Sequence, residues 1–199
     1  MGVSVYRRSC SIAGVPAPVP LPYPHPPLGQ GSIALRPWQD ADLETMAAIC
    51  SDPDVARFTR VPDPYSEADA RAGIDAPPGR LEAGEGLALA IADGGGAPVG
   101  SVGLRIDPSD REIAEAGYMV APAARGRGVA TTALRLVSCW GLRDLGLARV
   151  HLTTHVENAA SQGVAERAGC RREGVLRSWE ELRGERVDLV MYSLVAADL

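Results

Sequence analysis

Hydrophobic residues change their spacing once in the middle of this chain, and that change limits the folds open to it. From residue 87 to residue 120, three short apolar or alternating runs are separated by turns rich in Asp, Gly and Pro. Such runs, joined by short turns, predict an antiparallel meander of three strands. From Gly126 to Leu142 the apolar residues recur every three or four positions, which predicts a long helix directly after the third strand.

Shorter signals predict the remaining elements. A first strand is expected to end at Pro37, and a helix to begin at Asp40. A second helix is expected to begin at the capping-box pattern of residues 66–69 and to be interrupted at residues 77–79. Further downstream the expected segments are a strand over 150–156, a helix over 159–167 and strands over 171–179 and 187–195. Together with the meander they predict an α/β (α+β) fold with a mixed, largely antiparallel central sheet flanked by helices.

The N-terminal segment differs from the rest of the chain in composition. From Val15 to Pro27 nearly every second residue is proline. Each proline fixes φ and removes a backbone donor, which excludes a helix or a central strand. We therefore expect residues 1–31 to form a flexible tail and residues 32–199 a single domain. The tail is interpreted as a bare extension whose removal leaves folding intact, with a docking peptide for an aromatic groove as the alternative.

Charge and cysteine spacing exclude several classes of partner. The chain carries a formal net charge of −5, which argues against nucleic-acid binding and favours a cationic partner such as an amine. Its four cysteines form no Cys-x-x-Cys pair, so neither zinc nor another metal is expected. No apolar run approaches the roughly 18 residues of a membrane span. We therefore expect a cytoplasmic protein that binds no membrane.

The bend before the long helix carries the strongest chemical signal. A helix N-terminus has free N–H groups and a partial positive charge, and Gly126 and Gly128 allow an anion to approach the backbone closely. Arg125 and Arg127 add charges of the kind that pair with phosphate oxygens. The pattern favours a pyrophosphate site, with a purely structural turn as the alternative. A nicotinamide-dependent oxidoreductase is disfavoured, because Thr131 stands at the third glycine position of the dinucleotide fingerprint.

The same bend resembles a family signature. Arg125-x-x-Gly128-x-Ala130 is similar to the acetyl-CoA signature Arg/Gln-x-x-Gly-x-Gly/Ala of the GNAT superfamily of N-acetyltransferases. Other segments resemble motifs of its RimJ/RimL-like branch, the ribosomal-protein-alanine acetyltransferases, and occur in the same order. These segments are Leu35-Arg36-Pro37-Trp38-x-Asp40, Glu115-Ala116-Gly117-Tyr118, Asn158-Ala159-Ala160-Ser161 and Glu166-Arg167-Ala168-Gly169-Cys170. The resemblance covers about residues 33 to 194.

The resemblance implies a sheet with a fork between its fourth and fifth strands, which admits the pantetheine arm of acetyl-CoA. It implies that backbone groups of Met119 and Val120 pair with that arm, and that the N–H of Val120 polarises the thioester carbonyl. It also implies a loop that holds the pyrophosphate and one asparagine that bonds the pantetheine amide. The residues implied for these contacts are Arg125, Gly126, Arg127, Gly128, Val129, Ala130 and Asn158.

The implied reaction is direct attack of a primary amine on acetyl-CoA in a ternary complex. Glu115 is expected to act as general base through water, with a surface carboxylate as the alternative. Many GNAT enzymes use a tyrosine as general acid at the position of Ala165. Ser161 is expected to take that role, with a polar residue on an exposed helical turn as the alternative, and Tyr118 is interpreted as a packing residue.

These inferences predict an N-acetyltransferase whose acceptor is a protein N-terminus or a small-molecule amine. A non-catalytic acyl-CoA-binding sensor on the same fold is the alternative, because the usual tyrosine is absent. The acceptor pocket is expected between residues 58–86 and the last two strands, which carry no recognisable motif. The sequence leaves open whether the chain forms a homodimer.

Overall fold

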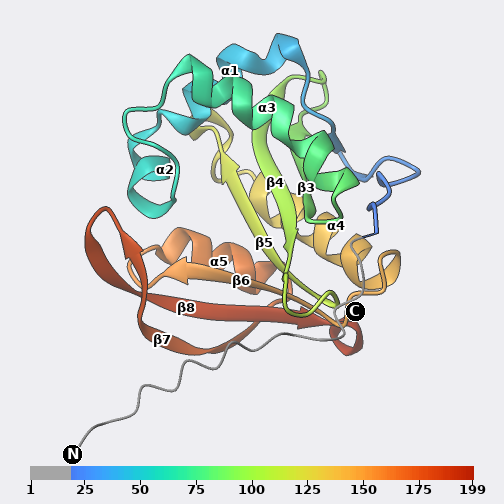
Figure 1. Cartoon of the computed structure of the whole chain (residues 1–199), viewed down its shortest axis with the longest axis vertical. Coiled ribbons are helices and arrows are strands. Elements are labelled where there is room, and N and C mark those ends of the chain that lie inside the picture. The colour runs from blue at the N-terminus through green and yellow to red at the C-terminus, as the bar shows by residue number, and fades with distance from the viewer. Residues whose placement is uncertain (1–18) are drawn as a thin grey trace, which may run out of the picture.

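The computed structural model describes residues 19–199, and its centre is one sheet of eight strands in the order β1-β2-β3-β4-β5-β6-β8-β7 (Figure 1). The strands are β1 (Gly29–Gln30), β2 (Ile33–Arg36), β3 (Gly86–Ala92), β4 (Pro98–Ile106), β5 (Ile113–Val120), β6 (Arg149–His155), β7 (Arg171–Leu182) and β8 (Glu185–Val195). All neighbouring pairs are antiparallel except β5 with β6. The prediction of a mixed, largely antiparallel sheet is therefore confirmed.

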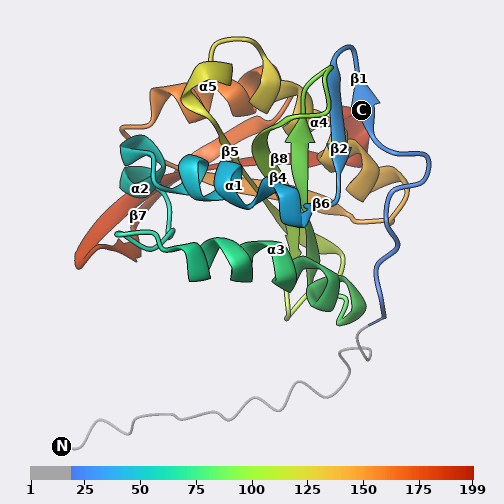
Figure 2. The same ribbon diagram turned by 90° about the horizontal axis from the view of Figure 1, so that it is seen from above.

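Helices cover both faces of this sheet (Figures 1 and 2). They are α1 (Leu43–Cys50), α2 (Pro53–Phe58), α3 (Glu67–Glu82), α4 (Val129–Arg143) and α5 (Ala159–Arg167). Side chains of α1 and α3 pack in one apolar cluster, whereas those of α4 and α5 pack in a second, larger one on the other face. Residues 40–42, where the first helix was expected to begin, form a 3₁₀ turn before α1.

The alternation in the strands decides which residues enter which cluster. Val102 and Leu104 of β4 are almost completely buried against α4, as are Ala114 and Ala116 of β5. Met119 of β5 has the opposite orientation and packs with the cluster beneath α1. Successive side chains of a strand point to opposite faces, so β5 presents one set of side chains to each helical layer.

Helix α3 differs from the sequence-based expectation. Its start is confirmed, because the side chain of Ser66 accepts a hydrogen bond from the Asp69 N–H in a capping box. The expected interruption is wrong, because the helix continues through Pro77 and Pro78 to Glu82. Pro77 is itself buried in the apolar face of the helix. Tertiary packing of this face therefore compensates for the two helical N–H donors that the prolines remove.

Helix α2 was not predicted, because the sequence Asp52-Pro53 was interpreted only as the end of the preceding helix. Asp52 is the N-cap of α2 and accepts a hydrogen bond from the Val55 N–H, and Pro53 occupies the first helical position. Acidic N-caps followed by proline are typical of helix starts. The same dipeptide thus ends α1 and begins α2.

Residues 19–31 lie against the domain, which corrects the expectation that ordered structure begins at residue 32. The N–H of Leu21 donates to the carbonyl of Leu81, and β1 pairs with β2. The side chains of Leu21 and Leu28 pack against the larger cluster. The remainder of the expected tail, residues 1–18, lies outside the described residues.

Removal of residues 1–30 should lower the melting temperature of the protein. The two half-buried leucines contribute about 1 kcal/mol each, and about 2 kcal/mol corresponds to roughly 4–8 °C in a chain of this length. Differential scanning calorimetry measures this shift. Val19→Ala is the control, because the Val19 side chain is exposed and its truncation should leave the midpoint unchanged. An unchanged midpoint in the truncated chain would show that these contacts add no stability.

Candidate functional site

The sheet contains a fork between β5 and β6. These two strands pair only over the first three residues of β5, from Ile113 with Arg149 to Glu115 with His151. Beyond this point β5 continues to pair with β4, and β6 continues to pair with β8. The predicted fork between the fourth and fifth strands of the domain is therefore present, and one edge of β5 has no strand partner there.

The register decides which backbone groups of β5 face this gap. The N–H of Ala121 donates to the carbonyl of Val99, which belongs to β4. In an antiparallel ladder every second residue directs both backbone groups to the same neighbour, so those of Met119 also face β4. Tyr118 and Val120 direct theirs into the fork. An extended ligand in the fork would therefore meet backbone groups of Tyr118 rather than those of Met119, which the resemblance implied.

A glycine-rich loop follows the open end of β5. Gly126 has φ +73° and Gly128 has φ +77°, in the left-handed region that favours glycine. A Cβ atom at either position would meet no protein atom within 4 Å, so the loop faces open space. Gly128 is the N-cap of α4 and, having no side chain, provides no side-chain cap. The N–H of Thr132 is the first that donates to the Gly128 carbonyl. The N–H groups ahead of it, including those of Val129 and Ala130, thus have no intrahelical partner and are available to an anion at the helix start.

The two loop arginines have different surroundings. The guanidinium of Arg125 donates to the carbonyl of Val120 at 3.1 Å, to Asp54 at 2.9 Å and to Asp52. This differs from the expectation that its charge serves a phosphate group. Arg127 is exposed and makes no ion pair with any residue from 19 to 199.

Asn158 stands where α5 begins, beside the end of β6. Its side-chain oxygen accepts a hydrogen bond from the Ser161 N–H at 3.0 Å, so Asn158 is the N-cap of α5. Its amide nitrogen, which bonds no described residue, is therefore left to bond a ligand, as is the second lone pair of its oxygen.

Ser161 and Tyr118 form a hydroxyl pair on the α5 side of β5. Their side-chain oxygens are 2.8 Å apart, and the Tyr118 hydroxyl also donates to the Ser161 carbonyl at 3.2 Å. Burial raises the pKa of Tyr118 to about 12, although its hydrogen bond with Ser161 acts in the opposite direction. The phenol therefore stays protonated at neutral pH. The sequence showed both residues, but only the contact between β5 and α5 shows that they form one unit.

Ala165 lies one helical turn after Ser161 and is completely buried. It packs in the larger apolar cluster rather than facing the fork. No hydroxyl is supplied from this position, and the Tyr118–Ser161 pair provides two hydroxyl groups one helical turn earlier.

Glu115 lies on the opposite side of β5, at the last position that pairs with β6. Its carboxylate forms an ion pair with Arg105 of β4. His151 is its register partner across the strands, and burial lowers the pKa of this imidazole more than the charge of Glu115 raises it. The carboxylate and the neutral imidazole therefore stand together where the fork opens.

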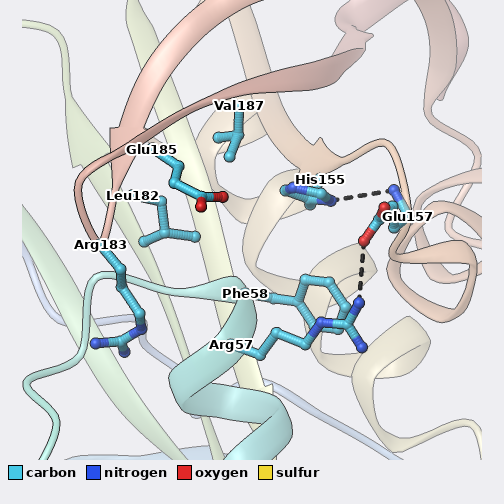
Figure 3. Close-up of a pocket in the computed structure, with 8 residues that line it drawn as sticks. All are labelled: Arg57, Phe58, His155, Glu157, Leu182, Arg183, Glu185 and Val187. Carbon is cyan, nitrogen blue, oxygen red and sulfur yellow. Dashed lines mark hydrogen bonds and ion pairs between the residues drawn. The ribbon is translucent and has the colours of Figure 1, made fainter.

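A pocket of about 360 Å³ lies between α2 and the turn of the β7–β8 hairpin (Figure 3). Phe58 and His155 contact each other there with ring centroids 5.6 Å apart, and Arg57 donates to Glu157 at 3.0 Å. Figure 3 shows the carboxylate of Glu185 directed into the pocket. The remaining lining residues are Leu182, Arg183 and Val187.

This pocket includes parts of the segments in which the acceptor pocket was expected. Phe58 and residues 182–187 belong to those segments. Arg57 of α2, and His155 and Glu157 at and just after the end of β6, lie outside them. These residues are brought to the pocket by tertiary structure alone, so no local pattern identifies them.

The described residues 19–199 also bear on metal binding and on membrane insertion. No group of three or more His, Cys, Asp and Glu side chains is arranged to hold a metal ion in this part of the chain. None of the helices in the same range has the length and hydrophobicity needed to cross a membrane.

Sequence comparisons agree with the site. The profile of the acetyltransferase (GNAT) domain family matches residues 32–171. A Bacillus subtilis protein named as a ribosomal N-acetyltransferase, YdaF, is 38% identical over 82 residues, which are 41% of this chain and 45% of that protein. The chain therefore spans less than half of YdaF in this match. A Bacillus licheniformis protein named as N-acetyltransferase p20 is 24% identical over 164 residues, 82% of this chain and 92% of p20.

A solved structure has the same fold. RimL, a ribosomal L7/L12 α-N-protein acetyltransferase in complex with coenzyme A, superposes with a TM-score of 0.75. The superposition covers 83% of this chain and 95% of RimL, at 19% sequence identity. The forked sheet and its helical layers are thus shared with that protein.

Gly128→Glu should weaken the binding of coenzyme A at least about 100-fold, which corresponds to roughly 2.7 kcal/mol. The substitution places a side chain and a negative charge where the loop would hold phosphates. Isothermal titration calorimetry with coenzyme A measures the effect.

Gly146→Glu is the matched control for this variant. Gly146 has φ +70° and equally open surroundings, so the same strain and charge are introduced at the other end of α4. Its affinity for coenzyme A should stay within about threefold of the unaltered protein. Equal affinities of the two variants would remove the phosphate site from the loop.

Proposed function

The chain belongs to the acetyltransferase (GNAT) family, and we propose that it transfers the acetyl group of acetyl-CoA to a primary amine. The observation that carries this proposal is the open glycine loop at the start of α4, directly beside a fork in the sheet. A long ligand with a diphosphate at one end and an extended amide arm fits these two features together. Acetyl-CoA has this composition.

The residues around the fork suit each part of this ligand. The loop from Gly126 to Ala130 would hold the diphosphate through backbone N–H groups and the charge of Arg127. Backbone groups of Tyr118 would pair with the pantetheine arm, and the Asn158 amide nitrogen would bond one of its carbonyls. When bound, acetyl-CoA supplies a thioester that is activated toward amines. The N–H of Val120 would stabilise negative charge on its carbonyl oxygen.

Transfer requires two proton movements. The amine nitrogen forms a bond to the acetyl carbon and loses a proton, while the carbon–sulfur bond breaks and the departing sulfur gains a proton. Glu115 would accept the first proton through water, and its ion pair with Arg105 holds the carboxylate on this face of β5. Ser161 would donate a hydrogen bond or a proton to the sulfur, supported by the Tyr118 hydroxyl.

The pocket between α2 and the β7–β8 hairpin would bind the acceptor. Phe58, Leu182 and Val187 provide apolar surface, and the Glu185 carboxylate, which forms no ion pair with residues 19–199, provides negative charge. These properties suit a cationic amine attached to a hydrophobic group. The names of YdaF and RimL favour an amine of a protein over a small molecule as the acceptor.

Release of free thiol from acetyl-CoA over a panel of peptide N-terminal amines and small amines tests the proposal. Turnover with at least one amine, together with mass-spectrometric detection of the acetylated product, is expected. Tight calorimetric binding of acetyl-CoA without turnover on any amine would favour the acyl-CoA sensor, for which the absence of the usual tyrosine at Ala165 is the supporting observation. Absence of binding would contradict both functions.

Ser161→Ala should lower kcat by about 100-fold and Tyr118→Phe by about tenfold, with the acetyl-CoA dissociation constant within about threefold of the original value. The reason is that both hydroxyls act on the departing sulfur rather than on binding. Steady-state kinetics on an active amine and calorimetry measure the two quantities.

Tyr192→Phe is the control, because its hydroxyl bonds Glu166 on the same helix α5 at 3.2 Å rather than Ser161. It should leave kcat unchanged. Equal losses of kcat and affinity in Ser161→Ala would reassign Ser161 to binding.

A further inference from the structure

We propose that Arg125 is a positioning residue that holds helix α2 against the open end of β5, and that it is not a phosphate ligand. The side chain of Arg125 then serves to position α2, which lines the proposed acceptor pocket, and does not bind the cofactor. The meaning of this proposal for catalysis rests on the proposed function, but the geometry that carries it does not.

Arg125 contacts the start of α2 through two carboxylates. Asp52 receives hydrogen bonds from the Val55 N–H at 3.2 Å and from the Arg125 guanidinium, so one side chain both caps the helix and joins it to the loop. Asp54, the second residue of α2, accepts a hydrogen bond from the other terminal nitrogen of Arg125 at 2.9 Å. Because bidentate, charge-assisted contacts fix orientation as well as distance, they determine where α2 begins.

The surroundings of Asp52 show that this contact is partly protected from water. Its side chain is only 12% exposed, whereas that of Asp54 is 68% exposed. Burial opposes ionisation of Asp52, but the hydrogen bonds from Arg125 and from Val55 outweigh it and hold its pKa below the ordinary value. Removal of the guanidinium would leave a partly buried carboxylate without its cation.

The third contact of Arg125 ties the helix to the strand. Its Nε donates to the carbonyl of Val120 at 3.1 Å. This carbonyl points into the fork and has no strand partner there. The guanidinium therefore occupies the last open acceptor of β5 and fixes the orientation of the residue whose N–H faces the thioester.

The far end of α2 shows what this positioning controls. The helix has only six residues, and its last two, Arg57 and Phe58, line the pocket. From the other side, Arg183 of the β7–β8 turn donates to the Ala56 carbonyl at 2.5 and 3.0 Å. Figures 1 and 2 both show α2 beside the tip of the hairpin. Arg125 and Arg183 thus hold α2 between the glycine loop and the β7–β8 hairpin.

Arg127 provides the contrast within the same loop. It lies between the two open glycines, is exposed, and has no carboxylate partner among residues 19–199. The two arginines therefore have different roles. Arg127 is available to a diphosphate, whereas Arg125 contacts α2.

Hydrogen–deuterium exchange of α2 and calorimetry with coenzyme A test this division in the full chain. Arg125→Gln should raise exchange of the amides of residues 55–58 at least about fivefold, with the exchange of α4 unchanged and the affinity for coenzyme A within about threefold. Arg127→Gln should give the reverse, with at least about tenfold weaker affinity and no change in α2. Arg125→Lys should restore α2 only partly, because an ammonium cannot reach all three acceptors in one geometry.

Asp52→Asn and Asp54→Asn keep the test decisive if Arg125→Gln folds poorly. Both should raise exchange in α2, and the double variant Arg125→Gln/Asp52→Asn should raise it no further than the stronger single variant, because the residues act as one unit. Unchanged exchange in α2 together with a loss of coenzyme A affinity in Arg125→Gln would overturn the proposal. If the unaltered protein fails to bind coenzyme A, the proposed function fails, while the exchange result still decides the role of Arg125.

Discussion

The parting of β5 and β6 after Glu115 is the constraint on which the rest of the site depends. Both strands keep their outer partners, β4 and β8, along their whole lengths. The sheet therefore stays rigid on each side of the gap while one edge of β5 is left without a partner. Unpaired backbone groups in a protein interior are costly, and a gap of this kind is stable only if side chains, water or a ligand satisfy them.

The protein satisfies some of these groups itself and leaves others open. Arg125 takes the carbonyl of Val120, and the Asn158 oxygen caps α5 at the mouth of the gap. The N–H of Val120 and the first turn of α4 receive no such partner from the described residues. The groups left free are donors, and in the proposed complex they would face the acyl carbonyl and the diphosphate of acetyl-CoA. This selective satisfaction explains why the loop needs glycine at two positive φ angles, because any Cβ would fill the space above those donors.

Local patterns in the sequence were sufficient where a local interaction decides the structure. Alternation located β3 to β5, and the capping box at Ser66 located the start of α3. They failed where contacts between distant residues decide the structure. At Pro77, burial of the proline side chain allows α3 to continue through both prolines. The direction of the Met119 backbone depends on the register of β5 with β4, which no pattern within β5 contains. For the same reason the charge of Arg125 was recognised while its partners, about 70 residues away, were not.

The distribution of groups around β5 also bears on the order of bond making. Glu115 and the hydroxyl pair lie on opposite faces, so in the proposed reaction the amine and the departing sulfur would each meet a different group. A two-step route through an acetylated enzyme would instead need a reactive nucleophile in the fork. Cys50, whose sulfur is 3.7 Å from that of Met119, is buried, and burial raises the pKa of its thiol, which keeps it protonated and weakly nucleophilic. Burial likewise raises the pKa of Cys170 to about 11. Neither thiol is therefore an activated nucleophile at neutral pH, which is consistent with the direct transfer that we propose.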